Sequence, residues 1–497
     1  MNNIPKPGLE HLALSGLGLL VLASCQTKTH PSAGGKGSNP NIVFILADDL
    51  GYGDLGCYGQ KHIPTPNIDQ LAREGMLFTS HYAGSTVCAP SRSSLFTGLH
   101  TGHTFIRGNR GVEPEGQYPL KAEILTLAEV LKASGYVTGV FGKWGLGPVG
   151  SEGDPNRQGF DTFFGYACQT LAHNYYPGHL WQNQEKIVLD ENYPDQKGAY
   201  APIRIHEQAL SFIRDHKDTS FFLFYPTTIP HAELIAPDSC MDKFRGMFLP
   251  EKSYQGTDSG ERFRKGPYAS QEECHATFAA MISLLDQQVG EIRAMLKELG
   301  LAENTLIVFT SDNGPHREGG ADPDYFDSNG PFTGYKRDLY EGGIRVPMIA
   351  AWPGTIPAQS TSQHVSAFWD FYPTFCELVG AQAPSDVDGI SFLPELIGGK
   401  QEQHDFLYWE FHEQGGKQAV RLGKWKGIRR NMDRNPEAPV ELYNLEIDPG
   451  EEQNCAEVHP EIVAEMVRIM KDEHQTSEVF RFGYEKNEFE KESDRIK

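Results

Sequence analysis

The apolar and polar positions along the chain predict strands that alternate with helices. Continuous apolar runs begin at residues 42 and 305, and each stops at acidic or amide side chains, as a strand buried on both faces does where it enters a loop. Between these runs the pattern predicts helices at 66–75, 126–135, 201–215 and 271–299, and strands at 136–142 and 220–226. This alternation predicts an α/β fold with a mixed, largely parallel central sheet sandwiched by helices.

The pattern changes after residue 395. Segments 404–413, 417–430 and 439–454 have the alternation and turn residues of hairpin strands, and an amphipathic helix is expected near 460–473. We therefore predict a main domain over 40–395 and a C-terminal α+β subdomain over 396–497, which is a smaller antiparallel sheet with one helix.

The N-terminus resembles a bacterial lipoprotein signal. An apolar stretch from Leu12 to Ala23, too short to span a bilayer, leads into Leu-Ala-Ser-Cys at Cys25. We predict a signal peptide over 1–25 with Cys25 lipidated, and a flexible Gly/Ser/Pro-rich tether over 26–39. The expected location is the periplasmic or cell-surface face of the outer membrane, reached only through the lipid anchor. A cleaved secretory signal is the alternative.

The net charge of the chain excludes some classes of binding partner. Among 497 residues, Lys and Arg total 44 and Asp and Glu total 66, a formal net charge of -22. This excess of negative charge repels nucleic acid and anionic membranes, so an anionic substrate needs a locally basic pocket. The eight cysteines include no CxxC pair and no zinc-ligand spacing. An exported protein can form one or two disulfides, but the sequence does not pair them.

The segment VCAPSRSSLFTG, residues 87–98, combines a cysteine with a predicted helix start. Pro90 suits the first turn of a helix, which we therefore expect to begin at about residue 90. Cys88 then lies at the helix mouth, and Arg92 adds a positive charge one turn in, so the position favours an anion. By itself the motif is more typical of a buried cysteine beside a helix start than of a functional one.

Several polar side chains follow predicted strands. Asp48 and Asp49 follow the first run, and Asp312 and Asn313 follow the run at 305. Four hard oxygen donors suit Ca²⁺ or Mg²⁺ and lack the imidazoles and thiolates of a zinc site. Lys143 and the segment 227–231 also follow strands, and ligands of open α/β sheets gather at the carboxyl ends of strands. We expect all these groups to meet at one edge.

In these motifs the chain resembles the type I sulfatases of the alkaline-phosphatase-like superfamily, close to the arylsulfatase and N-acetylgalactosamine-sulfatase types. CAPSRSSLFTG matches the family signature Cys-x-Pro-Ser-Arg-x-x-x-x-Thr-Gly. VFGKWGLG, FTSDNG and GYKRDLYEGGIRVPMIAAWPG follow in the family's order, and the resemblance extends from about residue 41 to residue 454. It implies a sulfuric ester hydrolase on an alkaline-phosphatase-like fold. Glu341 and Arg345 are expected to form a structural salt bridge.

The resemblance also implies roles for individual residues. Cys88 becomes formylglycine through a formylglycine-generating maturation enzyme, and the hydrated aldehyde is the nucleophile. Residue 88 binds a divalent cation, Ca²⁺ rather than Mg²⁺, together with Asp48, Asp49, Asp312 and Asn313. The remaining roles are support of the hydrate by Arg92, neutralisation of sulfate by Lys143 and Lys336, and protonation of the leaving oxygen by His231 with Lys336.

One position departs from the family pattern. Many members read Gly-Lys-Trp-His-Leu-Gly, whereas this chain has Gly145 in place of the histidine that assists formylglycine. Glycine cannot transfer a proton, so another group does this work or the elimination step proceeds without it. His103 is a candidate for this role or for contact with the substrate. The alternative is that His103 has a purely structural role.

The expected substrate is a sulfated glycan. Segment 168–186 combines aromatic side chains with His173 and Asn174, a mixture that suits stacking on a sugar and hydrogen bonding to it. We expect galactose or N-acetylgalactosamine 4- or 6-sulfate in host or algal glycans. The alternatives are a phosphonate or phosphate ester hydrolase on the same fold, and a catalytically silent glycan-binding surface lipoprotein.

Overall fold

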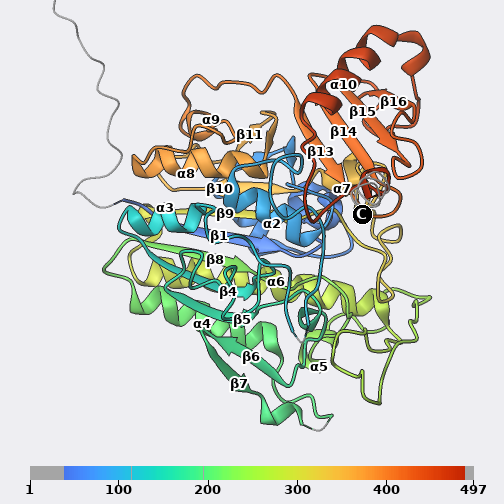
Figure 1. Ribbon diagram of the computed structural model, residues 1–497. Helices are drawn as coiled ribbons and strands as arrows, with labels where there is room; N and C mark the ends of the chain where they lie inside the picture. The colour runs from blue at the N-terminus through green and yellow to red at the C-terminus, as the bar shows by residue number, and fades with distance from the viewer. Residues whose placement is uncertain (1–38, 114, 194, 487–497) are drawn as a thin grey trace, which may run out of the picture. The chain divides into compact units, whose positions relative to one another are not determined.

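The computed structural model describes residues 39–486 except 114 and 194 (Figure 1). The predicted signal peptide, its Cys25 and nearly all of the predicted tether lie outside the described residues. Across the part that is described, no helix has both the length and the apolar character needed to cross a bilayer.

The centre of the fold is a ten-stranded sheet in the order β11-β2-β10-β9-β1-β8-β4-β5-β6-β7. Its five middle strands, β9 to β5 in this order, are parallel, whereas the β10–β2, β10–β9, β5–β6 and β6–β7 pairs are antiparallel. The bounds are β1 (Asn41–Ala47), β2 (Met76–Phe78), β4 (Val137–Lys143), β5 (Thr162–Tyr166), β6 (His179–Gln182), β7 (Glu185–Val188), β8 (Phe221–Pro226), β9 (Thr305–Ser311), β10 (Met348–Ala351) and β11 (Ser360–Ser362). The predicted mixed, largely parallel sheet is confirmed.

Helices cover both faces of this sheet, because alternate side chains of β1 enter two different cores. Val43 and Ile45 belong to the core under one helix layer, and Phe44 and Leu46 belong to the core under the other. The first layer contains α1 (Pro66–Glu74), α4 (Ala201–Asp215) and α6 (Cys274–Glu298), and the second contains α2 (Cys88–Thr97), α3 (Leu127–Ala133) and α8 (Phe371–Val379). The continuous apolar run at 42–47 thus predicted its burial correctly.

A second, antiparallel sheet follows in the C-terminal part of the chain (Figure 1, orange to red). Its strands pair in chain order: β13 (Leu407–Phe411), β14 (Lys417–Leu422), β15 (Trp425–Arg430) and β16 (Val440–Asn444). Helix α10 (Pro460–Asp472) packs on one face through Met466 and Met470, while Trp409 and Ile428 pack with Tyr82, Ile344 and Trp369, which precede residue 395 and lie outside the ten-stranded sheet. The predicted small sheet with one helix is confirmed, and the boundary at residue 395 stays a prediction.

A buried ion-pair network joins the C-terminal sheet to residues 341–345. Lys426 of β15 lies 2.8 Å from Glu341, whose other oxygen lies 3.1 Å from Arg345. The expected Glu341–Arg345 salt bridge is therefore present, and it holds the C-terminal sheet as well.

The structure corrects two details. Helix α2 begins at Cys88, not at about residue 90, because the first-turn N–H groups need no intrahelical partner and Pro90 fits inside that turn. The seven described cysteines are all free, so none of them forms the disulfide that an exported protein could carry.

The C-terminal part also provides a test of pH-dependent stability. His474 contacts Glu410 at 2.7 Å and Glu485 at 3.0 Å. Burial alone would lower the pKa of His474, but the hydrogen bonds to these carboxylates raise it to about 9. A raised pKa stabilises the fold fully below the unfolded value near 6.5, and this stabilisation is lost as the pH rises through about 9.

We expect His474→Gln to lower the free energy of unfolding by about 2 kcal/mol at pH 6 and to have almost no effect at pH 9.5. The value at pH 6 is smaller than the full pKa shift implies, because solvent screens part of the interaction. Urea denaturation of both proteins across this range measures the difference. A stability gap that does not change with pH would contradict the assignment.

Candidate active site

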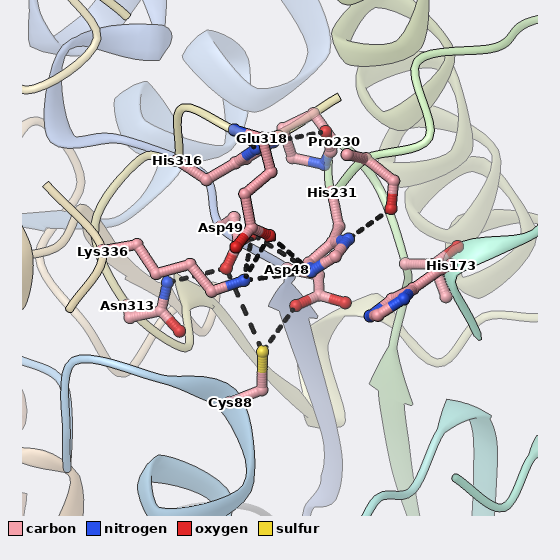
Figure 2. A network of polar contacts seen from close by, with 12 residues as sticks. Asp48, Asp49, Cys88, His173, Pro230, His231, Asn313, His316, Glu318 and Lys336 are labelled. Carbon is pink, nitrogen blue, oxygen red and sulfur yellow. Dashed lines mark hydrogen bonds and ion pairs between the residues drawn. The ribbon is translucent and has the colours of Figure 1, made fainter. Parts of the chain in front are cut away.

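The candidate active site lies at the carboxyl ends of β1, β4, β8 and β9, against the first turn of α2 (Figure 2). Every predicted metal-binding or catalytic residue lies here and is at most 7% exposed: Asp48, Asp49, Cys88, Arg92, Lys143, His231, Asp312, Asn313 and Lys336. Strand ends supply most of these side chains, whereas Lys336 comes from the loop before α7 (Glu341–Ile344). The structure thus brings together residues that are far apart in the sequence.

Cys88 points from α2 toward the two adjacent aspartates (Figure 2). Its Sγ lies 3.3 Å from Asp48 Oδ1, 4.0 Å from Asp49 Oδ1 and 3.4 Å from Lys143 Nζ. Burial, with the charges of Asp312 and Asp48, raises the pKa of the Cys88 thiol well above its usual value. Because the thiolate is the reactive form, unmodified Cys88 is a poor nucleophile in this site.

Arg92 fixes the relative positions of the strand ends. Its Nη2 lies 2.8 Å from Asp312 Oδ2 and 3.7 Å from Asp48 Oδ1, and its Nη1 donates to the main-chain carbonyl of Lys143. One guanidinium, from a residue one turn after Cys88 in α2, therefore joins the ends of β1, β4 and β9. The described contacts give Arg92 a positioning role, and its predicted contact with the hydrate stays a prediction.

Asp49 and Lys336 form an ion pair on another side of the site. Asp49 has a φ of 62°, a left-handed conformation that is uncommon for residues other than glycine and that occurs at functional sites. Its Oδ2 accepts a hydrogen bond from Lys336 Nζ at 2.8 Å, and its Oδ1 accepts one from Asn313 Nδ2 at 2.7 Å. The Lys336 ammonium offsets the cost of burying this carboxylate.

His231 is oriented by its two ring nitrogens. Nδ1 faces the carbonyl of Ala232, which can only accept, so Nδ1 carries the proton and Nε2 accepts a hydrogen bond from Lys336 Nζ at 3.0 Å. The rings of His173 and His316 stack on either side at centroid distances of 4.9 and 5.5 Å. Burial and the charge of Lys336 lower the pKa of His231, which keeps the ring neutral without a bound anion.

The oxygen donors of this site fit a hard divalent cation. Asn313 Oδ1 is buried and has no hydrogen-bond partner among the described residues. Ligand atoms of Asp48, Asp49 and Cys88 lie within 4.8 Å of one another. Burial and Asp48 raise the pKa of Asp312 to about 6 despite Arg92, so this group of carboxylates favours additional positive charge. Oxygen donors of this type suit Ca²⁺ or Mg²⁺.

The residues predicted to contact substrate are separated by the structure. His173 lies beside His231, with its Nδ1 at 3.0 Å from the carbonyl of Gly266. Asn174 is fully buried, and its amide bonds to Pro267 O and to the N–H of Gly266, so it positions that loop. His103 contacts the Asp388 carboxylate at 2.9 Å, and no contact described for it reaches Cys88 or the oxygen donors.

Sequence reasoning missed Glu318, which completes the Lys336 side of the site. Its Oε2 lies 3.4 Å from Lys336 Nζ and accepts a hydrogen bond from Tyr268 Oη at 2.9 Å, while Oε1 pairs with Arg337. Its place in the loop that follows the Asp312-Asn313 pair was the available signal. Glu318 and Asp49 thus both contact Lys336, and their carboxylates lie close to each other (Figure 2).

Comparison with known families covers nearly the whole described chain. The family model described as Sulfatase matches residues 40–381, and the one described as N-sulphoglucosamine sulphohydrolase, C-terminal, matches residues 331–477. The first match includes all the oxygen donors, Cys88, His231 and Lys336.

Individual relatives agree with this. Arylsulfatase A of Homo sapiens is 33% identical, over 89% of this chain and 89% of that protein. N-acetylgalactosamine-6-O-sulfatase of Bacteroides thetaiotaomicron is 28% identical, over 91% of this chain and 97% of that protein. The crystal structure of Ps i-CgsB in complex with k-i-k-neocarrahexaose is similar with a TM-score of 0.74 at 28% identity, covering 92% of this chain and 98% of that one. The chain belongs to the sulfatase family and is a sulfuric ester hydrolase.

Proposed function

We propose that the protein removes sulfate from galactose or N-acetylgalactosamine units of a glycan, at position 4 or 6, through a formylglycine made from Cys88. The observation that carries this proposal is the position of Cys88 Sγ, between the Asp48 carboxylate and the Lys143 ammonium in a closed site. The similar N-acetylgalactosamine-6-O-sulfatase and the similar structure with a bound neocarrahexaose support a carbohydrate substrate.

The nucleophile and the cation have separate tasks. Because the Cys88 thiol is held neutral, its conversion to a hydrated aldehyde would supply the oxygen nucleophile that the thiol cannot. A Ca²⁺ ion held by Asp48, Asp49, Asp312 and Asn313 would lower the pKa of that oxygen and bind the sulfate. Arg92 contacts two of these ligands, Asp48 and Asp312, and keeps them in place.

The cationic side chains prepare the site for an anion. The three carboxylates Asp48, Asp49 and Asp312 face three cations, Arg92, Lys143 and Lys336. This part of the site is therefore balanced in charge, and a divalent cation would make it positive. A sulfate ester thus meets a favourable local field in a chain whose net charge is -22.

His231 and Lys336 are placed to protonate the leaving oxygen. The Lys336 ammonium donates to His231 Nε2, so a proton can pass between them at a distance of 3.0 Å. A sugar alkoxide is a poor leaving group and needs this proton as the bond to sulfur breaks.

Space for the sugar lies beside the His173 loop. A cavity of about 560 Å³ is lined by Glu115, Cys168, Thr170, His179 and Lys265, among others. Glu115 bonds to His179 at 2.9 Å and to Trp181 Nε1 at 2.7 Å, and Glu115 and His179 both line the cavity, so its wall has a carboxylate and an imidazole. Such polar groups suit the hydroxyl groups of a sugar.

The proposal includes export. The lipoprotein-like N-terminus would place the enzyme on the periplasmic or cell-surface face of the outer membrane through lipidated Cys25, where it meets glycans of host or algal origin. It also requires a formylglycine-generating enzyme in the same cell. Mass spectrometry of the mature N-terminus and of the peptide containing residue 88 tests both points.

Calcium binding is expected to stabilise the fold. At a free Ca²⁺ concentration 100-fold above Kd, the free energy of unfolding should rise by about 2.7 kcal/mol. The variant Asn313→Ala removes one neutral oxygen donor and should show a smaller rise at the same concentration. Thermal unfolding after EDTA treatment, with and without CaCl₂, measures this, and an equal effect on both proteins would exclude Asn313 as a ligand.

The substrate is tested with protein co-expressed with a formylglycine-generating enzyme. We expect sulfate release from 4- or 6-sulfated galactose or N-acetylgalactosamine, with a clear preference for one position. Release of phosphate or phosphonate in preference to sulfate would favour the esterase alternative. Glycan binding without release of any of these groups would favour the silent lipoprotein.

A further inference from the structure

Gln169 is a buried polar side chain that the described contacts leave without a partner. It is 5% exposed, and neither its Nε2 nor its Oε1 has a hydrogen-bond partner among the described residues. A buried carboxamide normally finds protein or water partners, since leaving both polar atoms unpaired is costly. Gln169 therefore requires an explanation beyond packing.

The residues next to Gln169 contact the active site at two places. It follows β5, where the carbonyl of Ala167 accepts a hydrogen bond from the N–H of Gly145 at 3.2 Å. Gly145 comes two residues after Lys143, whose Nζ lies 3.4 Å from Cys88 Sγ. Farther along the same loop, His173 stacks on His231. The loop that contains Gln169 therefore contacts the active site at two places, near Lys143 through Gly145 and near His231 through His173.

Gln169 also occupies the space next to Gly145. A Cβ atom built on Gly145 would lie 2.1 Å from Gln169 Nε2, and Gly145 has a φ of +77°, which side-chain-bearing residues rarely adopt. Residue 145 is where the family pattern has histidine. In this chain the carboxamide fills the position that such a side chain would enter, so a glycine at 145 and a glutamine at 169 are sterically matched.

We propose that Gln169 is a catalytic residue that donates a hydrogen bond from Nε2 to a non-bridging oxygen of the bound sulfate group, in place of the missing side chain at 145. The inference rests on the proposed sulfatase reaction and identifies one of its binding groups. A carboxamide donates a hydrogen bond at any pH but transfers no proton, so proton transfer stays with His231 and Lys336.

The test compares two variants with a matched control. Gln169→Met keeps an unbranched side chain of similar size and removes both polar atoms, and Gln169→Glu keeps the shape but replaces the donor with a carboxylate. Gln158→Leu is the control, because Gln158 is 1% exposed, has an unpartnered Oε1 and lies before β5, at the end of the strand opposite Gln169. Formylglycine content is measured for each protein, and rates are expressed per matured site.

We expect Gln169→Met to lower kcat/KM for sulfate release by about 100-fold, comparable with the loss of one donor to a developing charge. Inhibition by inorganic sulfate should weaken about 10-fold or more, while Tm stays equal or rises because an unpaired buried amide has been removed. Gln169→Glu should bind sulfate at least as poorly because the carboxylate repels it. Gln158→Leu should lower Tm and leave sulfate inhibition unchanged.

The inference is overturned if Gln169→Met retains kcat/KM and sulfate inhibition within about twofold of the parent protein, or if its losses track a fall in Tm as in the Gln158 control. Failure of the parent protein to release sulfate from any ester would instead count against the proposed function. The two failures are therefore distinguishable.

Discussion

Replacing Cys88 with alanine is expected to abolish sulfate release, by at least about 10⁴-fold, because it removes the nucleophile and one contact of the cation site. The methyl group of alanine fits the space of the thiol, so folding and glycan binding should persist. The measurement is sulfate release by matured protein, with Tm recorded for both proteins. The matched control is Cys376→Ala, since Cys376 is likewise 1% exposed but lies in α8, away from the site.

The control should lose some stability and keep its activity per folded molecule. Residual activity above about 1% in Cys88→Ala would contradict the role of Cys88 as precursor of the nucleophile. A loss of the same size in Cys376→Ala would instead indicate that cavities in the core inactivate the enzyme.

His231→Gln is expected to lower kcat for a sugar sulfate by about 10³-fold, in the range for loss of a general acid. For an aryl sulfate with an acidic phenol as leaving group, the loss should be only about 10-fold, because that phenolate departs without a proton. The reason is the position of His231 Nε2, 3.0 Å from Lys336 Nζ, from which it can receive the proton that it passes to the leaving oxygen. Steady-state kinetics with the two substrate classes measure the difference.

His316→Gln serves as the control. This ring stacks on His231 at 5.5 Å, but its Nε2 faces the carbonyl of Pro230 at 3.3 Å. We expect a small loss that is equal for both classes of substrate. An equal loss for both classes in His231→Gln would show that His231 orients the site and is not the proton donor.

The sequence predicted the parts of the fold that rest on continuous or strongly periodic patterns. The run at 42–47 predicted both a buried strand and the carboxylates at its end, and the rule that ligands gather at strand ends placed Asp312 beside Asp49. Strands β2, β5, β6, β7, β10 and β11 were not predicted, because none of them is longer than five residues and so short a run carries too little periodicity to stand out.

Contacts that depend on tertiary structure lay beyond sequence reasoning. His103 follows the helix of Cys88 closely in the chain, yet its partner Asp388 is 285 positions away. Gln169 carries no motif of its own, and only the space left by the missing side chain of Gly145 gives it significance. Glu318 had a signal in its loop position, but the contact with Lys336 depends on how that loop folds back.

The complete enclosure of α2 sets an order of events during biosynthesis. All ten of its residues are buried, and Cys88 itself is 1% exposed beneath the strand ends. A thiol in this position cannot enter the catalytic pocket of a second protein once the sheet has closed over it. The proposed oxidation of residue 88 would therefore have to happen while the chain is still extended, so the proposed maturation enzyme would compete in time with folding, and chains that fold first would stay inactive.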